Sequence, residues 1–414
     1  MTLRSLLLKE EYWTKAYEKL ILKNNISKGV KNELTVLYTF ERETLVDELL
    51  NGNYKWSIPQ KIEISKHGTN RKRVVYIYSE KDRLVQGVLY RACSEYFKDK
   101  ISKSCYSYKT SQSTSSAIKY ILNNKTENYK YGVKIDIHSY FNSVSKQRLI
   151  EMIDELFKDT ELYKSICDLM LSDKVSIRGN LYEEYKSLTP GSPIASFFAN
   201  YCLRECDLYF DKLPIIYARY SDDIIIIDEK KENLQGYLDV ILNFLNKYGL
   251  TLNPDKYTWF EEGDEVSYLG LKIDSDGNID ISDHAFKKIK KQIHRWCRKG
   301  RVRIERDKSP FEKEARFVFK QLNNKNFKCY VRDNSTFGWC HYAFRYITTT
   351  KTLEQIDKYT VDTMRAMYTG KHNKANNRHL QNGELEKLGY VSMVQLYKLY
   401  KEDFDYYCEV IELL

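Results

Sequence analysis

The clearest pattern of hydrophobic positions lies in the stretch "PIIYARYSDDIIIID". Residues 214–217 and 224–227 are apolar runs with little alternation, which predicts two buried strands. Ser221, Asp222 and Asp223 stand between them. Because successive side chains of a strand point to opposite faces, neighbouring aspartates share one site only where a tight turn separates the strands. Ser and Asp favour turns, so the pattern predicts a polar turn through these three residues, and its paired anions suggest a metal site.

An alternating pattern upstream predicts a half-buried strand that carries another carboxylate, Asp136. Val133, Ile135 and Ile137 occupy the apolar positions, which places Asp136 on the polar face. A helix is expected to follow, with Ser145 as its N-cap. A two-metal site on phosphates needs an acid from a second element, and Asp136 is the candidate. A helix cap or a salt bridge would explain an acid at this position equally well.

The segments between and after these strands predict helices. In "LTPGSPIASFFANYCL", Ser192 is the expected N-cap and Pro193 the first helical residue of a mostly buried helix. Its N-terminus could face a phosphate or sugar, although a plain buried helix has the same pattern. A later apolar stripe over 234–245 predicts a helix that Gly249 ends in a left-handed cap. The strand "SYLGLKID" and the turn "SDGN" follow, and the whole order suits a split βαβ sheet.

Composition adds a preference for a polyanionic partner. Among 414 residues, 67 Lys and Arg stand against 57 acids, for a net charge of +10. The 35 tyrosines suit base stacking, but a genome-wide compositional bias explains them as readily. Nine scattered cysteines show no zinc spacing and are expected to be buried free thiols. The apolar run 6–8 is too short for a signal peptide and no stretch approaches transmembrane length, so a cytoplasmic protein with no membrane partner is expected.

Taken together, these stretches resemble a bacterial reverse transcriptase of the kind found in group II introns, retrons and defence-associated systems. The similarity covers roughly residues 56–275, with the motifs in the family's order. The matching stretches are "NRKRVVYIYSEKDRLVQGVLYRACSEYF", "CYSYKTSQSTSSAI", "DIHSYFNSV", "GSPIASFFAN", "RYSDD", "GLTLNPDKY" and "YLGLKI".

The resemblance implies an α+β fold shaped as a right-hand polymerase, in which fingers, a palm with a split βαβ antiparallel sheet and a helical thumb follow along the chain. We expect an N-terminal helical extension at 1–55, fingers at 56–130, a palm at 131–280 with a fingers insertion near 146–187, and a helical thumb with a C-terminal extension at 281–414.

The resemblance also implies the catalytic residues. Asp136, Asp222 and Asp223 match the metal-binding triad, with the Ile137 carbonyl as an extra ligand, for two Mg²⁺ ions or alternatively Mn²⁺. Phe141 matches the aromatic gate beneath the sugar of the incoming nucleotide, where a 2′-hydroxyl would clash. A core phenylalanine is the other interpretation of this residue.

Four further residues match nucleotide-binding positions of the family. Arg71 and Arg73 match basic residues that hold the triphosphate, Gly191 belongs to the second motif, and Lys256 matches a lysine that assists pyrophosphate departure. Each of the three charges could also be an ordinary solvated side chain. The chain departs from the family at Pro190, where Gln is usual.

Beyond residue 280 the interpretation rests on physical pattern. Phe286, Ile289, Ile293 and Trp296 form an apolar stripe on a predicted helix rich in basic residues. We expect this thumb helix to bind nucleic acid through phosphate contacts, although a solvated helix face is the alternative. The basic positions chosen for that role are Lys287, Lys291, Arg295 and Arg298. A polar loop is expected at 370–379, and no RNase H, protease, integrase or endonuclease signature is visible.

The expected function is an RNA-directed DNA polymerase that uses dNTPs to copy an associated structured non-coding RNA into cDNA, in antiphage defence. Three alternatives stay open: a retron reverse transcriptase, a template-independent or protein-primed DNA polymerase, and a non-catalytic RNA-binding maturase-like factor. The template, the primer and the oligomeric state are left undecided by the sequence.

Overall fold

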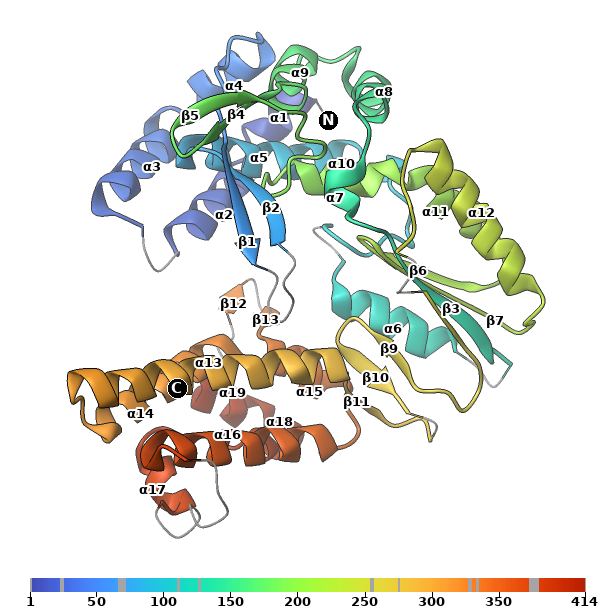
Figure 1. Cartoon of the computed structure of the whole chain (residues 1–414). Helices are drawn as coiled ribbons and strands as arrows, with labels where there is room; N and C mark the ends of the chain where they lie inside the picture. Colours follow the sequence, from blue (N-terminus) through green and yellow to red (C-terminus); the bar gives the residue numbers. More distant parts are fainter. Residues whose placement is uncertain are drawn as a thin grey trace. The chain divides into compact units, whose positions relative to one another are not determined.

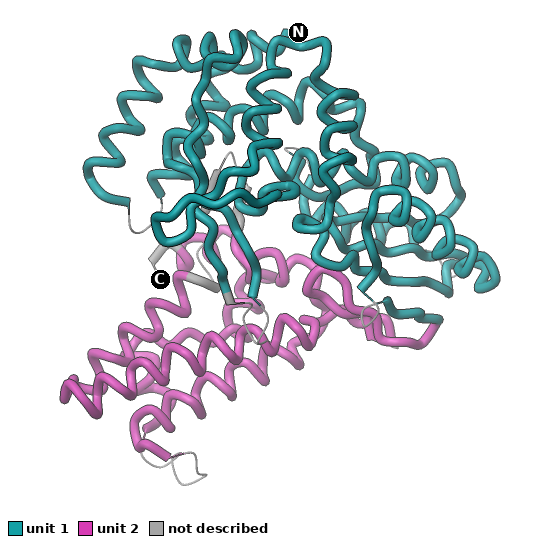
Figure 2. Tube along the Cα trace, turned by 45° about the horizontal axis from the view of Figure 1, so that its top comes forward, with its two compact units in different colours: residues 1–66, 70–261 teal, residues 67–69, 262–414 magenta. Residues whose placement is uncertain are grey.

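The structure is a computed structural model in which helices and short strands form two units (Figures 1 and 2). The first unit comprises residues 1–66 and 70–261, and the second contains 262–414. The described residues are 2–22, 26–65, 72–109, 112–125, 128–253, 257–274, 276–326, 330–332, 335–371 and 380–413.

A four-stranded antiparallel sheet in the first unit, the central sheet, has the order β6-β7-β3-β8. Its strand β3 is the predicted alternating strand, and the apolar residues Val133, Ile135 and Ile137 are buried as expected. All four isoleucines of 224–227 are buried, so both faces of β7 are covered. Helix α12 contacts β3 and β7, and α6 contacts β6 (Figure 1). The bounds are β3 (Tyr131–Asp136), β6 (Ile216–Tyr220), β7 (Asp223–Asp228), β8 (Thr258–Phe260), α6 (Thr114–Asn124) and α12 (Asn233–Lys247).

Two strand predictions need correction. The first strand of the aspartate turn begins at Ile216 rather than Pro214, and it continues to Tyr220, which pairs with Asp223. Asp223 is therefore the first residue of β7, and only Ser221 and Asp222 form the turn, because the ladder continues until the left-handed Ser221 interrupts it.

The predicted strand over 267–274 is instead a hairpin of β9 (Val266–Tyr268) and β10 (Leu271–Ile273), which pairs onward with β11 (Ile279–Ile281). Positive φ angles of 49° at Leu269 and 89° at Gly270 reverse the chain there.

A second four-stranded sheet in the first unit has the order β2-β1-β4-β5. Helices from the N-terminal region share one hydrophobic core with α5 and with helices that follow β3 in the chain. The strands are β1 (Gln60–Ser65), β2 (Lys72–Ile77), β4 (Lys174–Ile177) and β5 (Asn180–Glu183). The N-terminal helices are α1 (Leu3–Leu7), α2 (Glu10–Ile21), α3 (Lys28–Phe40) and α4 (Arg42–Leu50), followed by α5 (Glu80–Tyr96) and the 3₁₀ turn η1 (Lys98–Lys100).

The helix-boundary predictions have different outcomes. The Ser145 side chain accepts a hydrogen bond from the Arg148 N–H at 3.1 Å, which confirms it as the N-cap of α8. Gly249, with φ of 69°, follows the end of α12 as predicted. The Ser192 prediction is wrong, because α10 begins at Ala195 and the Ser192 hydroxyl donates to the Gln86 side chain at 2.6 Å instead. The helices of this region are α7 (Tyr140–Ser143), α8 (Lys146–Phe157), α9 (Tyr163–Met170), α10 (Ala195–Cys202) and α11 (Arg204–Phe210).

The second unit is mainly helical. Its longest helix, α13 (Asp283–Asp307), packs against α14 (Phe311–Asn326) and α16 (Lys351–Thr369). Ile289 and Ile293 of the predicted stripe are buried, while Phe286 and Trp296 are half-buried. The other elements are β12 (Tyr330–Arg332), β13 (Ser335–Phe337), α15 (Trp339–Tyr346), α17 (Asn382–Lys387), α18 (Met393–Glu402) and α19 (Phe404–Leu413). Most of the predicted polar loop, from 372 to 379, lies outside the described residues.

Two sequence-level features are visible across the described part of the chain. Every cysteine within it is a free thiol, and most of these thiols are buried. Among the described helices, none combines the length and the apolar character needed to cross a membrane.

Candidate active site

The central sheet brings two of the predicted carboxylates to one place. Asp136 is the last residue of β3, Asp223 is the first residue of β7, and the two are paired in register. Because residues directly opposite each other in an antiparallel pair point to the same face, both carboxylates lie on one face of the sheet. The Ile137 N–H donates to the Asp222 carbonyl at 3.1 Å, which ties the turn to the end of β3.

Two polar residues outside the predicted site contact these carboxylates. The Asn253 side-chain amide donates to Asp136 Oδ1 at 3.3 Å, and its backbone N–H donates to the Asp136 carbonyl at 2.9 Å. The Lys134 ammonium lies 3.7 Å from Asp223 Oδ1. Alternation along β3 places Lys134 on the same face as Asp136, so that signal was present in the sequence. Asn253 reaches the site only through the bridge between Ile137 and Leu252, which no local pattern reveals.

The donor set suits a hard divalent cation. Asp136 and Asp223 offer carboxylate oxygens on one face, with Asp222 in the adjoining turn. Over the residues that the structure describes, no three His, Cys, Asp or Glu side chains form a ready-made metal cluster. That is compatible with Mg²⁺, which proteins usually bind through one or two carboxylates together with water and substrate phosphates.

The turn itself is held by a buried polar network. Ser221 adopts φ of 62°, a conformation that costs a non-glycine residue on the order of 1–2 kcal/mol. Its N–H donates to Ser107 Oγ at 2.9 Å, and its carbonyl accepts from the Arg219 guanidinium at 3.1 Å. The Ser107 hydroxyl in turn donates to the Asn200 side chain at 2.8 Å. These bonds stabilise the left-handed turn from beneath.

A fully buried ion pair anchors this network. Arg219 and Asp207 each have 0% exposed side chains, and their two hydrogen bonds measure 2.7 and 2.5 Å. The Tyr217 hydroxyl also donates to Asp207 at 2.7 Å, and Arg219 donates to the Asn200 carbonyl at 3.0 Å. Burial opposes the charged form of Arg219, but the charge of Asp207 and its hydrogen bonds raise the pKa of the guanidinium overall. Arg219 is therefore held in its charged form.

A group of aromatic rings in the first unit leads to the aspartate turn. Phe141, on the short helix α7, is half-buried and makes edge contacts with Tyr140 at 5.8 Å and with Tyr108 at 6.0 Å between ring centroids. Tyr108 also lies 6.3 Å from Tyr220, the residue before the turn. Phe141 is thus connected to the aspartate turn through a chain of ring contacts.

The segment that contains Pro190 and Gly191 lies against strand β2. The Tyr76 N–H donates to the Pro190 carbonyl at 2.8 Å, and a Cβ on Gly191 would stand 2.7 Å from the Tyr76 carbonyl oxygen. Gly191 also has φ of 106°, so only glycine fits without displacement of the backbone. Pro190 acts through its carbonyl, so its missing N–H does not affect this contact. Arg73 is exposed on the same strand.

The remaining predicted residues fall elsewhere or outside the description. Arg71 and Lys256 lie outside the described residues. The four basic residues selected on the thumb helix are all exposed on α13 of the second unit, and they are Lys287, Lys291, Arg295 and Arg298.

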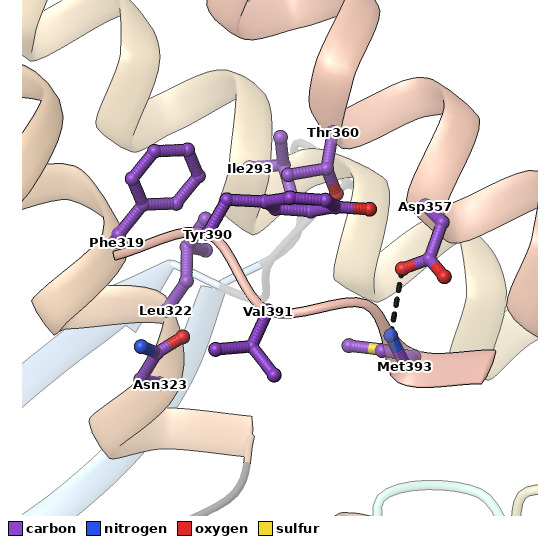
Figure 3. A pocket seen from close by; sticks show the side chains of 9 residues that line it. All are labelled: Ile293, Phe319, Leu322, Asn323, Asp357, Thr360, Tyr390, Val391 and Met393. Carbon is purple, nitrogen blue, oxygen red and sulfur yellow. Dashed lines mark hydrogen bonds between the residues drawn. The ribbon is translucent and has the colours of Figure 1, made fainter. Parts of the chain in front are cut away.

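A pocket in the second unit is lined in part by Asp357, and the role of this carboxylate is to cap a helix (Figure 3). Asp357 lies at its edge and accepts hydrogen bonds from the Met393 N–H at 2.8 Å, the Val394 N–H at 3.2 Å and the Ser392 hydroxyl at 2.6 Å. Burial raises the pKa of Asp357 although these bonds oppose the rise. The carboxylate therefore accepts hydrogen bonds from backbone N–H groups in the first turn of α18, which have no partner within the helix.

Comparison with known proteins defines the class. The family described as reverse transcriptase (RNA-dependent DNA polymerase) matches residues 64–273. This match includes every motif of the site described above, and the chain belongs to the reverse transcriptase family. The predicted enzyme class and right-hand polymerase fold are confirmed at this level, and polymerases of the family use divalent metal ions. The predicted domain boundaries and the roles of individual residues stay predictions.

Individual relatives are more distant. The retron Ec73 reverse transcriptase of Escherichia coli is 26% identical over 261 residues, which cover 57% of this chain and 74% of that protein. The enzymatic polyprotein of Soybean chlorotic mottle virus is 32% identical over 94 residues, covering 20% of this chain and 13% of the polyprotein.

Two telomerase structures are also similar to the chain, each with a TM-score of 0.42. An apo telomerase from Candida tropicalis, truncated from its C-terminal domain, is 16% identical, with 54% of this chain and 55% of that chain covered. A Candida albicans telomerase in complex with a telomeric RNA fragment is 14% identical, with 87% and 66% covered.

The buried ion pair gives a stability prediction. Asp207→Asn leaves the Arg219 charge buried without its partner, so we expect the free energy of unfolding to fall by about 3–5 kcal/mol. Tyr217→Phe is the matched control, because it removes one hydroxyl bond to the same carboxylate and should cost only about 1 kcal/mol. Urea unfolding followed by tryptophan fluorescence measures both variants. Equal destabilisation of the two would show that the pair is not the anchor of the turn.

Proposed function

We propose that the chain synthesises DNA on an RNA template with Asp136, Asp222 and Asp223 as its metal-binding residues. The observation that carries the proposal is the β3–β7 register, which sets Asp136 opposite Asp223, together with the hydrogen bond from the N–H of Ile137, the residue after β3, to the Asp222 carbonyl. Two Mg²⁺ ions, when bound, would activate the primer hydroxyl and neutralise the triphosphate and the leaving pyrophosphate. Asp136, Asp222 and Asp223 would hold these ions, with the Ile137 carbonyl as a further oxygen ligand.

The neighbours of these carboxylates prepare the site. Lys134 offsets the mutual repulsion of Asp136 and Asp223, whose like charges are held on one face. Asn253 donates hydrogen bonds to both the carboxylate and the backbone carbonyl of Asp136, which fixes the orientation of that side chain. The site is thereby organised before substrate arrives, which reduces the cost of ordering it during the reaction.

The nucleotide is bound between residues of two other segments. Phe141 lies beneath the sugar and excludes a 2′-hydroxyl, which makes dNTPs the substrate. Gly191 and Arg73 belong to segments joined through β2, so a nucleotide that contacts one is close to the other. Arg71 binds the triphosphate and Lys256 assists departure of the pyrophosphate, as the family resemblance implies.

The exposed basic face of α13 binds the nucleic acid. Lys287, Lys291, Arg295 and Arg298 contact phosphates without regard to sequence. The template is a structured non-coding RNA associated with the protein, and the cDNA made from it serves antiphage defence. Retron reverse transcription is the second candidate, and the identity with the retron Ec73 enzyme favours it. The paired carboxylates weigh against a non-catalytic RNA-binding role. The chemistry of the cDNA 5′ end tests whether a protein tyrosine serves as the primer.

Removal of the turn carboxylates tests the chemistry. We expect Asp222→Ala combined with Asp223→Ala to abolish dNTP incorporation on an RNA template, because Asp136 is then the one member of the triad left to hold the metal ions. Incorporation of labelled dNTP by the purified protein measures this, and circular dichroism reports the fold. Asp239→Ala, an exposed carboxylate on α12, is the matched control and should keep full activity. Residual incorporation at the wild-type rate in the double variant would refute the assignment.

Charge reversal tests the grip on nucleic acid. We expect Glu at Lys287, Lys291, Arg295 and Arg298 to weaken RNA binding and cDNA yield together. The slope of log affinity against log salt should also become shallower, by roughly 0.7–0.9 for each phosphate that the protein no longer neutralises. The matched control reverses four exposed lysines on other helices of the same unit, namely Lys351, Lys358, Lys387 and Lys398. RNA binding equally weakened by both sets would mean that α13 has no special role.

The biological role is tested in cells. We expect sequencing to show cDNA from one structured non-coding RNA in cells that carry the active protein, and none with the Asp222 and Asp223 variant. The chemistry of the cDNA 5′ end distinguishes an RNA hydroxyl, a DNA end and a protein tyrosine as primer. A broad phage panel then separates the two candidate roles. Unchanged phage sensitivity on loss of the gene would leave retron reverse transcription as the function.

A further inference from the structure

The segment Ser104–Tyr108 overlaps one of the stretches that resemble the family, and its aromatic residue Tyr108 has no role in the catalytic scheme above. It runs beside β6, the strand that leads into the aspartate turn. The Arg219 N–H donates to the Ser104 carbonyl at 2.9 Å, and the Tyr106 N–H donates to the Arg219 carbonyl at 2.8 Å. Cys105 and Arg219 form an isolated parallel bridge. The segment is therefore fixed to the strand that carries Tyr220.

The segment ends in two residues with fixed positions. Ser107 accepts the Ser221 N–H, as described above, and the next residue, Tyr108, has φ of 49°. A bulky residue rarely adopts this left-handed conformation, and surrounding bonds must hold it there. The Tyr90 hydroxyl donates to the Tyr108 carbonyl at 2.6 Å and supplies such a bond. The backbone thus directs the Tyr108 ring in spite of its conformational cost.

The Tyr108 ring bridges Phe141 and Tyr220. Its plane is at 89° to that of Phe141, with centroids 6.0 Å apart, and at 41° to that of Tyr220 at 6.3 Å. These separations lie within the range at which aromatic pairs attract each other. The second contact of Phe141 is Tyr140, which is buried and whose hydroxyl donates to the Ala199 carbonyl at 2.5 Å. Phe141 is thus supported by one ring from its own helix and by one ring from the Ser104–Tyr108 segment.

We propose that Tyr108 is a positioning residue for sugar selection, which keeps the Phe141 ring where it would clash with a 2′-hydroxyl. The inference rests on the proposed role of Phe141 as the aromatic gate. A ring excludes one added oxygen only while it cannot tilt away, and Tyr108 blocks that movement from the side of the aspartate turn. Tyr108 acts through Phe141 and does not itself touch the sugar.

The experiment compares deoxyribonucleotides with ribonucleotides of the same base. Tyr108→Ala should lower the ratio of kcat/KM for dNTP to that for NTP by roughly three- to tenfold, the range that one aromatic pair allows. Tyr108→Phe keeps the ring and should restore the wild-type ratio. Tyr90→Phe removes the bond to the Tyr108 backbone and should shift the ratio in the same direction by a smaller factor. Thermal unfolding of each variant shows that the proteins compared are folded.

The outcomes separate this inference from the proposed gate. If Phe141→Ala lowers the ratio but Tyr108→Ala does not, Tyr108 has no positioning role and the gate stands. If Phe141→Ala leaves the ratio unchanged, both assignments fall. A Tyr108→Ala protein that loses activity equally on both nucleotides would show a packing role only and would also overturn the proposal. If that variant does not fold, Tyr108→Leu and Tyr90→Phe decide the matter by the same ratio.

Discussion

The antiparallel register of β3 and β7 is the constraint on which the site depends. With Ile135 opposite Ile224, the next pair along the ladder is Asp136 opposite Asp223. A slip of one residue would turn one of these carboxylates to the other face of the sheet. The isoleucines of β7 prevent the slip, because they are buried on both faces and any shift would expose them or bury polar groups in their place. The hydrophobic core thus determines which oxygen atoms face one another.

The buried pair of Arg219 and Asp207 contributes more to the conformation of the aspartate turn than to the stability of the fold. Removing two charges from water is costly, and a well-packed apolar pair of similar volume can stabilise a fold as much or more. An apolar pair would leave the Ser221 and Asn200 carbonyls without their donor, whereas Arg219 makes four hydrogen bonds that fix both of them relative to Asp207. The pair therefore holds a strained turn in one conformation, the kind of fixed geometry that the proposed metal-binding role would require.

Close backbone approach has a similar effect where Pro190 and Gly191 meet β2. Gly191 lies so near the Tyr76 carbonyl that no side chain fits, and the Pro190 carbonyl accepts the Tyr76 N–H. The family's usual Gln at position 190 is absent, but the backbone link to β2 is made without it. Gly191 is thereby held against Tyr76, which lies on the same strand as Arg73.

The sequence alone determined the elements and the candidate carboxylates. The unbroken isoleucine run predicted a strand covered on both faces, the alternation of Val133, Ile135 and Ile137 predicted the strand that bears Asp136, and Ser145 and Gly249 marked helix ends. These signals are local, since they depend on side-chain periodicity and on the preferences of single residues. The same reasoning misplaced the end of β6 and the N-cap of α10. Pairing across the sheet and a hydrogen bond to distant Gln86 decided those positions.

Only the tertiary structure showed the residues that support the site. No local pattern links Asn253, Asp207, Ser107 or Tyr108 to the carboxylates, and each contacts the site from another segment of the chain. Their roles depend on hydrogen bonds and ring contacts between segments, for which no periodicity exists. The chemistry of the site could be inferred from carboxylates at the ends of predicted strands. The geometry that orients those carboxylates comes from packing between segments distant in sequence. The local sequence around one residue does not show which distant residue it will contact, so only the tertiary structure decides this geometry.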